Sequence, residues 1–345
     1  NYKASGVSGH SLMVFGIGDG GGGPGEEHLE RLARIRNLAG LSPVQQRSVA
    51  DFFEDWQADA DHFATWVGEL YLERHQGTYT TQARNKRANR QSELALRALE
   101  IAALSDVLWA GGSYPAERLL LIWREVLLYQ FHDILPGSSI KRVYDESLPR
   151  YEAMLAELHE RTGAHLAHLA AQADTRGMDA PLLVWNPLSW ARSEWIRNNT
   201  SWLHVTVPPL GYAVVDAAAQ PGRDALGALA ATPERLENDL LRVQFGPDGA
   251  ITSVYDKRAA REVLADGEPA NRLAVYHDAG DAWDIPFDYA EQPVRHMALA
   301  ASEARLDGPR AVVTQTYQIG NSELRQDIAL TAGSARLDFA TTLRW

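Results

Sequence analysis

The chain has 345 residues, of which 45% are apolar and 23% charged, and it contains no cysteine. That length favours two or three domains, and the composition is that of an ordinary globular protein with a sizeable core. The net charge of -12 argues against nucleic acid or an anionic membrane as the main partner. The lack of cysteine excludes disulfides, thiolate metal ligands and cysteine nucleophiles, and fits a reducing cytoplasm. No apolar run approaches the roughly 20 residues that span a bilayer.

Residues 1–42 have the pattern of a single strand–loop–helix unit. The apolar stretch "SLMVFGIG" (11–18) predicts a strand, and "PGEEHLERLARIRNLAG" (24–40) predicts a helix with Pro near its start and Gly after its end. Such a unit is typical of a larger parallel structure and cannot close a sheet or barrel alone. The sequence also begins without Met or a signal pattern, and its last strand pattern stops without a turn. We therefore expect a fragment.

Residues 43–173 are expected to form an antiparallel three-helix bundle. Apolar residues recur at helical spacing along the first helix: Leu94, Ala98, Ile101, Ala102 and Leu108. The next segment, "AERLLLIWREVLLYQ" (116–130), is apolar on nearly every face, which predicts a buried helix. A third helix is expected from about Ser147, and the short connections favour a bundle.

Residues 174–181 are polar, end in Pro and are expected to form a linker. From residue 182 to 345 the pattern changes to short alternating strands without helices between them, which predicts an antiparallel β-sandwich. Within it, "GPDG" (246–249) lies between two apolar runs and predicts a hairpin turn. The fold class is therefore a multi-domain α+β arrangement.

Two polar constellations precede the bundle's first long helix. In "GIGDGGGGP" (16–24), four glycines follow Asp19, without the Lys and Ser/Thr of a phosphate loop. This stretch is either a flexible connection or a place where glycines leave room for a bulky neutral ligand beside Asp19. In "HQGTYT" (75–80), Tyr79 lies among many hydrogen-bonding groups just before a helix start.

A third constellation, "QFHDILPGSSI" (130–140), places His132 and Asp133 where an apolar helix meets a Pro-Gly break. Imidazole is a common zinc ligand and an adjacent carboxylate can bind substrate, although a His-Asp pair at a helix end is more often structural. Two other groups have metal-like spacing, "DADH" (59–62) and the pair His165 and His168. We interpret the first as surface and the second as lacking a carboxylate partner on its own helix.

Several long stretches resemble the glycoside hydrolase family 38 α-mannosidases, in particular the cytosolic, vacuolar and bacterial branch. They occur in the family's order: "FGIGDGGGGP", "GELYLERHQGTYTTQARNKRANR", "LLYQFHDILPGSSIKRVY", "VWNPLSWAR" and "NRLAVYHDAGDAWDI". The resemblance implies that residues 1–42 are the end of an incomplete (β/α) barrel that carries the site. It also implies zinc-dependent, retaining hydrolysis of α-mannosides by two carboxylates.

The resemblance also implies roles for four residues of this chain. His132 matches a zinc ligand, Asp133 a hydrogen-bonding partner of the bound mannose, Asp19 the acid/base carboxylate, and Tyr79 a residue lining the sugar site. The family's other zinc ligands include a His-x-Asp pair, and this chain contains none. One Zn²⁺ is expected, with its remaining ligands upstream of this chain. The isolated chain is therefore expected to be inactive, although its parent is an enzyme.

Other functions remain open at this point. One is a relative acting on mannosylglycerate-type or phosphorylated α-mannosides, against which the lack of Lys or Arg from Val7 to His28 counts mildly. The other is a non-catalytic carbohydrate-binding or assembly module, which the ten Trp would suit. The expected partner is an α-mannoside oligosaccharide or glycan fragment, and a homo-oligomer is possible. The segment "SEWIRNNTSWLHV" (193–205) is shorter than the resemblance leads one to expect, which suggests that residues are missing there.

Overall fold

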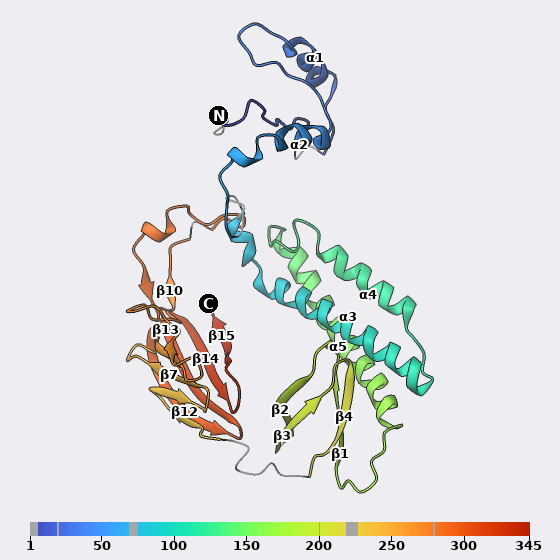
Figure 1. Ribbon diagram of the computed structural model, residues 1–345, viewed down its shortest axis with the longest axis vertical. Helices are drawn as coiled ribbons and strands as arrows, with labels where there is room; N and C mark the ends of the chain where they lie inside the picture. Colours follow the sequence, from blue (N-terminus) through green and yellow to red (C-terminus); the bar gives the residue numbers. More distant parts are fainter. Residues whose placement is uncertain (1–5, 19–20, 69–74, 200, 219–226, 279) are drawn as a thin grey trace. The chain divides into compact units, whose positions relative to one another are not determined.

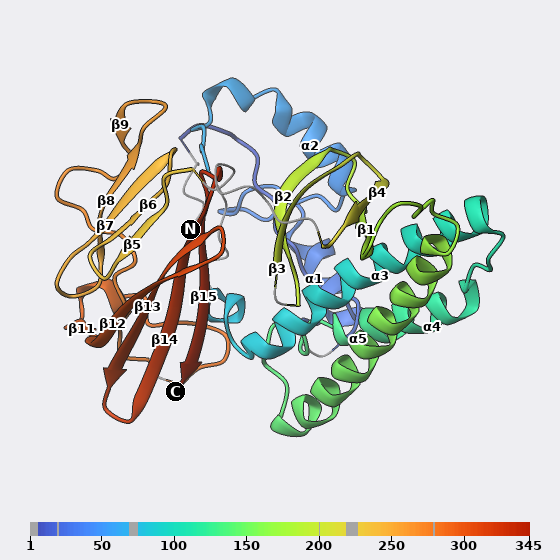
Figure 2. The same cartoon turned by 90° about the horizontal axis from the view of Figure 1, so that it is seen from below.

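A computed structural model describes residues 6–18, 21–68, 75–199, 201–218, 227–278 and 280–345 of the chain. The chain divides into two compact units, Asn1–Tyr71 and Leu72–Trp345. Figures 1 and 2 show the ribbon from two directions. In the part of the chain that the structure describes, no helix is long and apolar enough to cross a lipid bilayer.

The first unit contains the helices α1 (Glu26–Ile35) and α2 (Val49–Gln57) and the 3₁₀ turn η1 (Ala60–His62). The helix predicted over 24–40 is present in its central part. The strand predicted over 11–18 is wrong, because the described residues there form only one isolated bridge, between Ile17 and Gly22. A strand is stable only when its backbone pairs with neighbouring strands, and the described residues of this unit contain no strand that could pair with it.

The second unit begins with a helical bundle of α3 (Ala83–Ala110), α4 (Ala116–Tyr129) and α5 (Lys141–Ala170). Ser147 Oγ donates to Asn85 Oδ1 near the start of α3 and α5, and His168 contacts Asp106 near their ends, both across 62 residues of sequence. This constant separation means that α3 and α5 run parallel, with α4 returning between their ends. The up–down–up order agrees with the predicted bundle (Figure 1).

The bundle core is an apolar cluster contributed by all three helices, comprising Ala95, Leu96, Leu99, Leu119, Ile122, Val126, Tyr151, Met154 and Leu158. The predicted stripe on α3 is only partly correct: Ala102 is fully buried, but Leu94 and Leu108 are exposed. Leu96 and Leu99, which were not in the stripe, are fully buried. The third helix begins at Lys141, six residues before the predicted Ser147.

The prediction that the second helix is buried on nearly every face is also wrong. Only Leu119, Ile122 and Val126 of α4 are buried. Four leucines of the same helix are exposed, namely Leu120, Leu121, Leu127 and Leu128. Residues three and four apart share a helix face, so one stripe of α4 is buried against α3 and α5 while the four leucines lie away from it.

After the bundle come two hairpin-like strand pairs. β1 (Pro181–Asn186) pairs with β4 (Gly211–Asp216), and β2 (Arg192–Asn198) pairs with β3 (Ser201–Val207), all antiparallel. Their facing sides enclose a small apolar core around Leu203, Val205 and Val207. In the segment that looked short in sequence, the register of β2 and β3 runs unbroken from Arg192 opposite Val207 to Asn198 opposite Ser201.

The rest of the second unit is a β-sandwich, as predicted. One sheet has the order β5-β6-β7-β8-β9 and the other the order β12-β13-β14-β15. The first sheet consists of β5 (Ala230–Thr232), β6 (Arg235–Glu237), β7 (Leu241–Phe245), β8 (Ile251–Asp256) and β9 (Arg261–Glu262). The second consists of β12 (Ala298–Asp307), β13 (Arg310–Ile319), β14 (Ser322–Thr331) and β15 (Leu337–Arg344). In the sequence between β9 and β12 come the short antiparallel pair β10 (Ala274–Val275) and β11 (Arg295–His296) and the 3₁₀ turn η4 (Tyr289–Glu291).

Inward side chains from both sheets form one apolar core: Leu236, Leu241, Val243, Phe245, Ile251, Ala311, Val313, Ile328 and Leu330. Figure 2 shows the two sheets as facing layers. The predicted hairpin turn at 246–249 is confirmed, since it joins β7 to β8 and Gly249 adopts a φ of +82°. A positive φ of this size favours glycine, which explains the residue at the end of "GPDG".

Candidate functional site

His132 and Asp133 lie in the turn that follows α4, as the sequence predicts. The side chain of His132 is 79% exposed and that of Asp133 is 42% exposed, with 3.6 Å between His132 Nε2 and Asp133 Oδ2. Ser138 Oγ donates to Asp133 Oδ1 at 3.1 Å, which orients the carboxylate from its other side. Both side chains are therefore accessible to a ligand while one oxygen of Asp133 is already held.

Side-chain hydroxyl groups that donate to backbone carbonyl oxygens hold the turn itself in place. Ser139 Oγ donates to the carbonyl oxygen of Asp133 at 2.7 Å, and Tyr144 OH donates to the carbonyl oxygens of Asp133 and Ile134 at 3.2 Å each. These donors come from the start of α5 and the residues just before it. Helix α4 ends at Tyr129, before the Pro-Gly pair, and that pair leads directly into the residues that hold the His-Asp turn.

Lys86 joins this turn to the "GTYTT" segment. Its ammonium donates to three carbonyl oxygens, those of Thr81 at 2.7 Å, Leu135 at 2.6 Å and Pro136 at 2.9 Å. Burial lowers the pKa of Lys86. The lysine acts as a fixed cationic bridge between two turns that are about 50 residues apart in sequence.

Gly137 makes the same junction possible. It adopts a φ of +99°, and a Cβ added there would lie 2.6 Å from the carbonyl oxygen of Thr81. A side chain at this position would therefore be strained by its backbone conformation and would collide with Thr81. This is the physical reason for the glycine in "LPGSS".

A third segment completes this corner of the second unit. Tyr79 ends the 3₁₀ turn η2 (Gln76–Tyr79), and Thr81 Oγ1 donates to the carbonyl oxygen of Ala282 at 3.1 Å. The backbone N–H of His75 donates to the Asp284 carboxylate, and the rings of His75 and Trp283 meet edge to face at 4.9 Å. Three stretches therefore meet here: 75–86, 131–139 and 282–284.

Two residues of the same corner adopt left-handed backbone conformations. His75 has a φ of +106° and Gln82 a φ of +53°, on either side of η2. Such conformations are uncommon for residues other than glycine and occur disproportionately at functional sites. Gly77, between them, is buried against Trp283, and a Cβ there would lie 3.1 Å from the Trp283 carbonyl group.

The four residues singled out in the sequence have different outcomes. His132 and Asp133 are adjacent in the structure, and Tyr79 lies on the neighbouring turn with its side chain 56% exposed. Asp19 lies outside the described residues. The described residues contain no group of three or more His, Cys, Asp or Glu side chains that could hold a metal ion.

Sequence reasoning missed Lys86 and the 282–284 segment. Lys86 stands in a run of basic residues that has the pattern of an exposed helix surface, and nothing local shows that its ammonium points back to the preceding turn. The stretch "DAGDAWD" (278–284) carries a family resemblance, but nothing local in it indicates a contact with residues 75–86. Glycine and threonine close to Tyr79 were the available signal, because both indicate a tightly folded backbone.

The pair His165 and His168 has a structural partner that the sequence did not indicate. Nδ1 of His165 lies 2.7 Å from Asp106 Oδ2, and Nδ1 of His168 lies 2.6 Å from Asp106 Oδ1. The carboxylate comes from α3 rather than from the histidines' own helix, and its side chain is only 4% exposed. Burial opposes ionisation of Asp106, but both histidines favour it, and the pKa of the carboxyl is lowered. This cluster ties α3 to α5.

Comparison with known proteins identifies the family. Three domain models match in order along the chain: "Glycosyl hydrolases family 38 N-terminal domain" over residues 1–69, "Alpha mannosidase middle domain" over 73–169 and "Glycosyl hydrolases family 38 C-terminal domain" over 236–345. The middle-domain match contains η2, all three bundle helices except the last residue of α5, and the His-Asp turn.

Curated relatives agree. The chain is similar to human alpha-mannosidase 2C1, with 35% identity over 366 aligned residues that cover 100% of this chain and 35% of the relative. It is also 37% identical to an alpha-mannosidase of Saccharomyces cerevisiae over 205 residues, which cover 56% of this chain and 18% of the yeast protein. The chain thus spans about a third of the length of the human relative.

Among solved structures, the fold is similar to that of an alpha-mannosidase from Enterococcus faecalis V583. The TM-score is 0.62 at 13% sequence identity, and the match covers 91% of this chain and 48% of the bacterial one. The three domain models and the curated relatives, with which this fold agrees, show that the chain belongs to glycoside hydrolase family 38.

Proposed function

We propose that this chain forms part of an α-mannosidase that hydrolyses terminal α-D-mannosides. The observation that carries the proposal is the ordered match to three domain models of one hydrolase family. The corner formed by 75–86, 131–139 and 282–284 adds support, because it presents an exposed imidazole, a carboxylate and hydroxyl groups on a fixed backbone. Since the chain spans about a third of its human relative, the activity is proposed for a longer protein that contains it.

Within this proposal the reaction proceeds with retention, using two carboxylates, one as nucleophile and the other alternating between acid and base. Asp19 is our candidate for the acid/base group. Asp133 would accept a hydrogen bond from a mannose hydroxyl, for which its orientation by Ser138 is suitable. Tyr79 would line the sugar site with its exposed ring.

We further propose that the complete enzyme uses zinc and that His132 provides one of its ligands. The described residues of this chain do not form a zinc site by themselves. Zinc sites in proteins use three or four side-chain ligands, whereas among the residues that the structure describes His132 and Asp133 belong to no group of three suited to the metal. The remaining ligands would come from outside these 345 residues. Location in the cytoplasm is proposed on the absence of cysteine alone.

The experiment is hydrolysis of an aryl α-mannoside by the full-length protein, with and without a chelator, beside the 345-residue chain. We expect hydrolysis by the full-length protein, loss of it with chelator, recovery with added zinc, and no hydrolysis by the chain alone. Full-length protein that is folded yet inactive on α-mannosides would overturn the proposal. Tight 1:1 zinc binding by the 345-residue chain would contradict the assignment of its missing ligands.

A further inference from the structure

The outer face of the β2–β3 hairpin carries aromatic and hydroxyl side chains in cross-strand pairs. Register places Ser193 opposite Thr206, Trp195 opposite His204 and Arg197 opposite Trp202. Alternate residues of the same strands, including Ile196 and Leu203, face the small apolar core. Since side chains alternate between the two faces of a strand, the aromatic face is the one turned away from that core.

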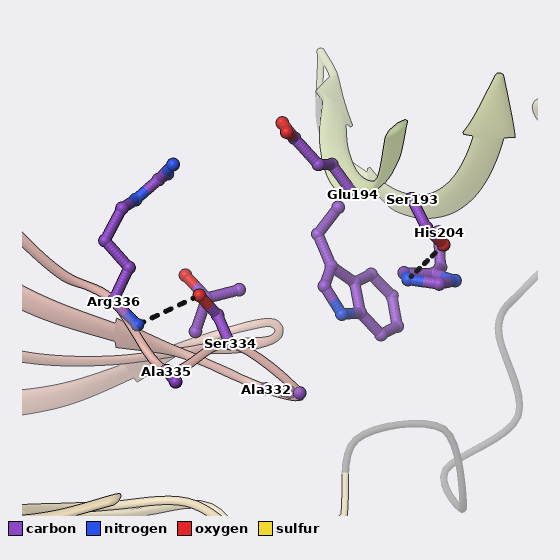
Figure 3. Close-up of a pocket in the computed structure, with 10 residues that line it drawn as sticks. Ser193, Glu194, His204, Ala332, Ser334, Ala335 and Arg336 are labelled. Atoms are coloured by element: carbon purple, nitrogen blue, oxygen red, sulfur yellow. Dashed lines mark hydrogen bonds between the residues drawn. The ribbon is translucent and has the colours of Figure 1, made fainter. Parts of the chain in front are cut away.

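This face takes part in a cavity of about 360 Å³. The cavity is lined on one side by residues of the hairpin and on the other by the turn between β14 and β15 (Figure 3). The hairpin contributes Ser193, Glu194, Trp195 and His204, and the turn contributes Thr331, Ala332, Gly333, Ser334, Ala335 and Arg336. The volume is within the range of roughly 300–1,000 Å³ that is usual for small-molecule sites.

Both walls of the cavity are held in place. On the turn side, the buried Asn238 amide donates to the carbonyl oxygens of Thr331 at 2.7 Å and Ser334 at 2.8 Å. The N–H of Ala332 donates to the Pro309 carbonyl oxygen at 2.8 Å, which joins this turn to the one between β12 and β13. The turn is therefore fixed by contacts to both sheets of the sandwich.

The β2–β3 hairpin packs on the turn between β12 and β13. Trp202 packs so closely on Gly308 that no Cβ would fit there, and Trp202 Nε1 donates to Asp307 Oδ1 at 3.4 Å. Arg197 lies over the Trp202 ring at 5.7 Å and pairs with Asp307 Oδ2 at 3.4 Å. The end of the hairpin is thus attached to the sandwich, while its middle, with Trp195 and His204, borders the cavity.

The lining is polar, and its charged side chains Glu194 and Arg336 are each paired with an oppositely charged neighbour. Arg336 Nε donates to Asp338 Oδ1 at 2.8 Å, and Arg192 makes a two-point contact with Glu194 at 2.8 and 2.5 Å. Apart from these charged side chains, the lining consists of the Trp195 indole, the His204 imidazole with its ring centre 5.1 Å from that of the indole, and several hydroxyl and backbone groups. A neutral ligand with an apolar face and a hydroxylated edge satisfies such a lining, because the indole offers a flat apolar surface and the hydroxyls both donate and accept.

We propose that this cavity is a non-catalytic binding site for a neutral oligosaccharide, with a sugar ring stacked on Trp195. Hydroxyl groups of the sugar would meet Ser193, His204 and the Thr331–Arg336 turn. The site is separate from the corner that carries His132. Its function does not require the proposed hydrolysis, so either can fail without the other.

The test is titration of the 345-residue chain with linear mannotriose and maltotriose, followed by calorimetry and by NMR of the tryptophan indole N–H groups. We expect saturable binding of at least one of them that shifts one indole signal, the one missing in Trp195→Ala. That variant should bind at least about tenfold more weakly, the effect of losing roughly 1.4 kcal/mol of stacking. Trp190→Ala is the matched control, because Trp190 is exposed outside the cavity, and it should bind as the wild type does.

A second variant keeps the test independent of hairpin stability. Ala335→Phe fills the cavity from the turn and leaves every hairpin contact unchanged, so we expect it to abolish binding with the thermal unfolding midpoint retained. Absence of saturable binding of either trisaccharide overturns the proposal. So does binding that Trp195→Ala and Trp190→Ala weaken equally, or binding that persists in Ala335→Phe.

Discussion

The buried face of helix α3 and the apolar core of the sandwich differ in composition. The face of α3 that is buried has five polar residues among its ten, with Asn85, Asn89 and Ser92 near one end and Ser105 and Asp106 near the other. The sandwich core is a continuous apolar cluster of nine residues from both sheets. Burial of polar groups is costly unless each is hydrogen-bonded, whereas apolar burial stabilises without regard to direction.

The polar end of α3 is the end next to the candidate site. There Tyr151 OH and Gln130 Nε2 both donate to Asn89 Oδ1, at 3.3 and 3.1 Å, and Lys86 holds the two site turns together. Directional bonds fix positions, and apolar packing supplies most of the free energy of unfolding. The polar end of α3 therefore holds backbone segments in position, whereas the apolar clusters of the bundle and the sandwich contribute burial.

The largest effect on stability is expected from truncation of a fully buried side chain in an apolar core. Leu330→Ala removes a fully buried side chain of the apolar core, and we expect the free energy of unfolding to fall by about 2–5 kcal/mol. Leu306→Ala, at an exposed position of the same sheet, should change it by less than about 0.5 kcal/mol. Urea unfolding followed by tryptophan fluorescence measures both. Equal losses in the two variants would contradict the assignment of Leu330 to the apolar core.

A smaller effect, of a different kind, is expected at Lys86. Lys86→Met keeps much of the side-chain volume but leaves three carbonyl oxygens without their donor, at a cost of about 2–3 kcal/mol. Hydrogen exchange should also accelerate in the turn 131–137 and in 77–82, while β13 and β14 stay protected. Lys141→Met is the control, since Lys141 is an exposed lysine paired only with Asp145. Unchanged exchange in both turns would show that the lysine does not position them.

The third effect is a pH dependence that belongs to the bundle. Arg118 and Arg161 hydrogen-bond Glu157, the first as the main cause, and they lower its pKa to about 2 from 4.5 despite partial burial. Because the folded-state pKa is lowered, this stabilisation is complete above about pH 4.5 and is lost as the pH falls towards about 2. Allowing for solvent screening of a side chain that is a quarter exposed, we expect about 1–2 kcal/mol.

Comparing Glu157→Gln with the wild type in urea at a series of pH values between about 2 and 7 checks this. The variant should be less stable above pH 5, and the difference should shrink as the pH falls below 4. Glu146→Gln is the control, because Glu146 is exposed and pairs only with Arg142 one turn away. A difference between Glu157→Gln and wild type that is constant over the whole range would contradict the assignment.

Local patterns in the sequence predicted a good part of the fold. The helices, the change to strands and the hairpin at 246–249 follow from periodicity and turn residues, which act over a few positions. The face of α3 was predicted only in part, because Leu94 and Leu108 are exposed while Asn85 and Asn89 are buried, the reverse of what hydropathy alone indicates. The strand at 11–18 failed for another reason, since its formation depends on pairing partners.

The place of His132 and Asp133 in the turn after α4 was predictable, but the contacts that hold this turn were less so. His132 and Asp133 could be found from a His-Asp pair at a helix end and from a family resemblance. The bridge from Lys86 to Leu135 and Pro136, the contact of Gly137 with Thr81 and the Asp284 contact with His75 all join distant parts of the chain. One sequence does not show such pairings, because each depends on how the bundle folds.

The central claim is that the His-Asp turn after α4 belongs to the sugar-cleaving site of a family 38 enzyme. The most direct measurement is kcat/KM for an aryl α-mannoside in the full-length protein carrying His132→Ala, beside Asp145→Asn, a change at an exposed position of α5. The account predicts a loss of at least roughly 100-fold for His132→Ala and a value within about twofold of wild type for Asp145→Asn. Equal activity of the two variants would contradict it.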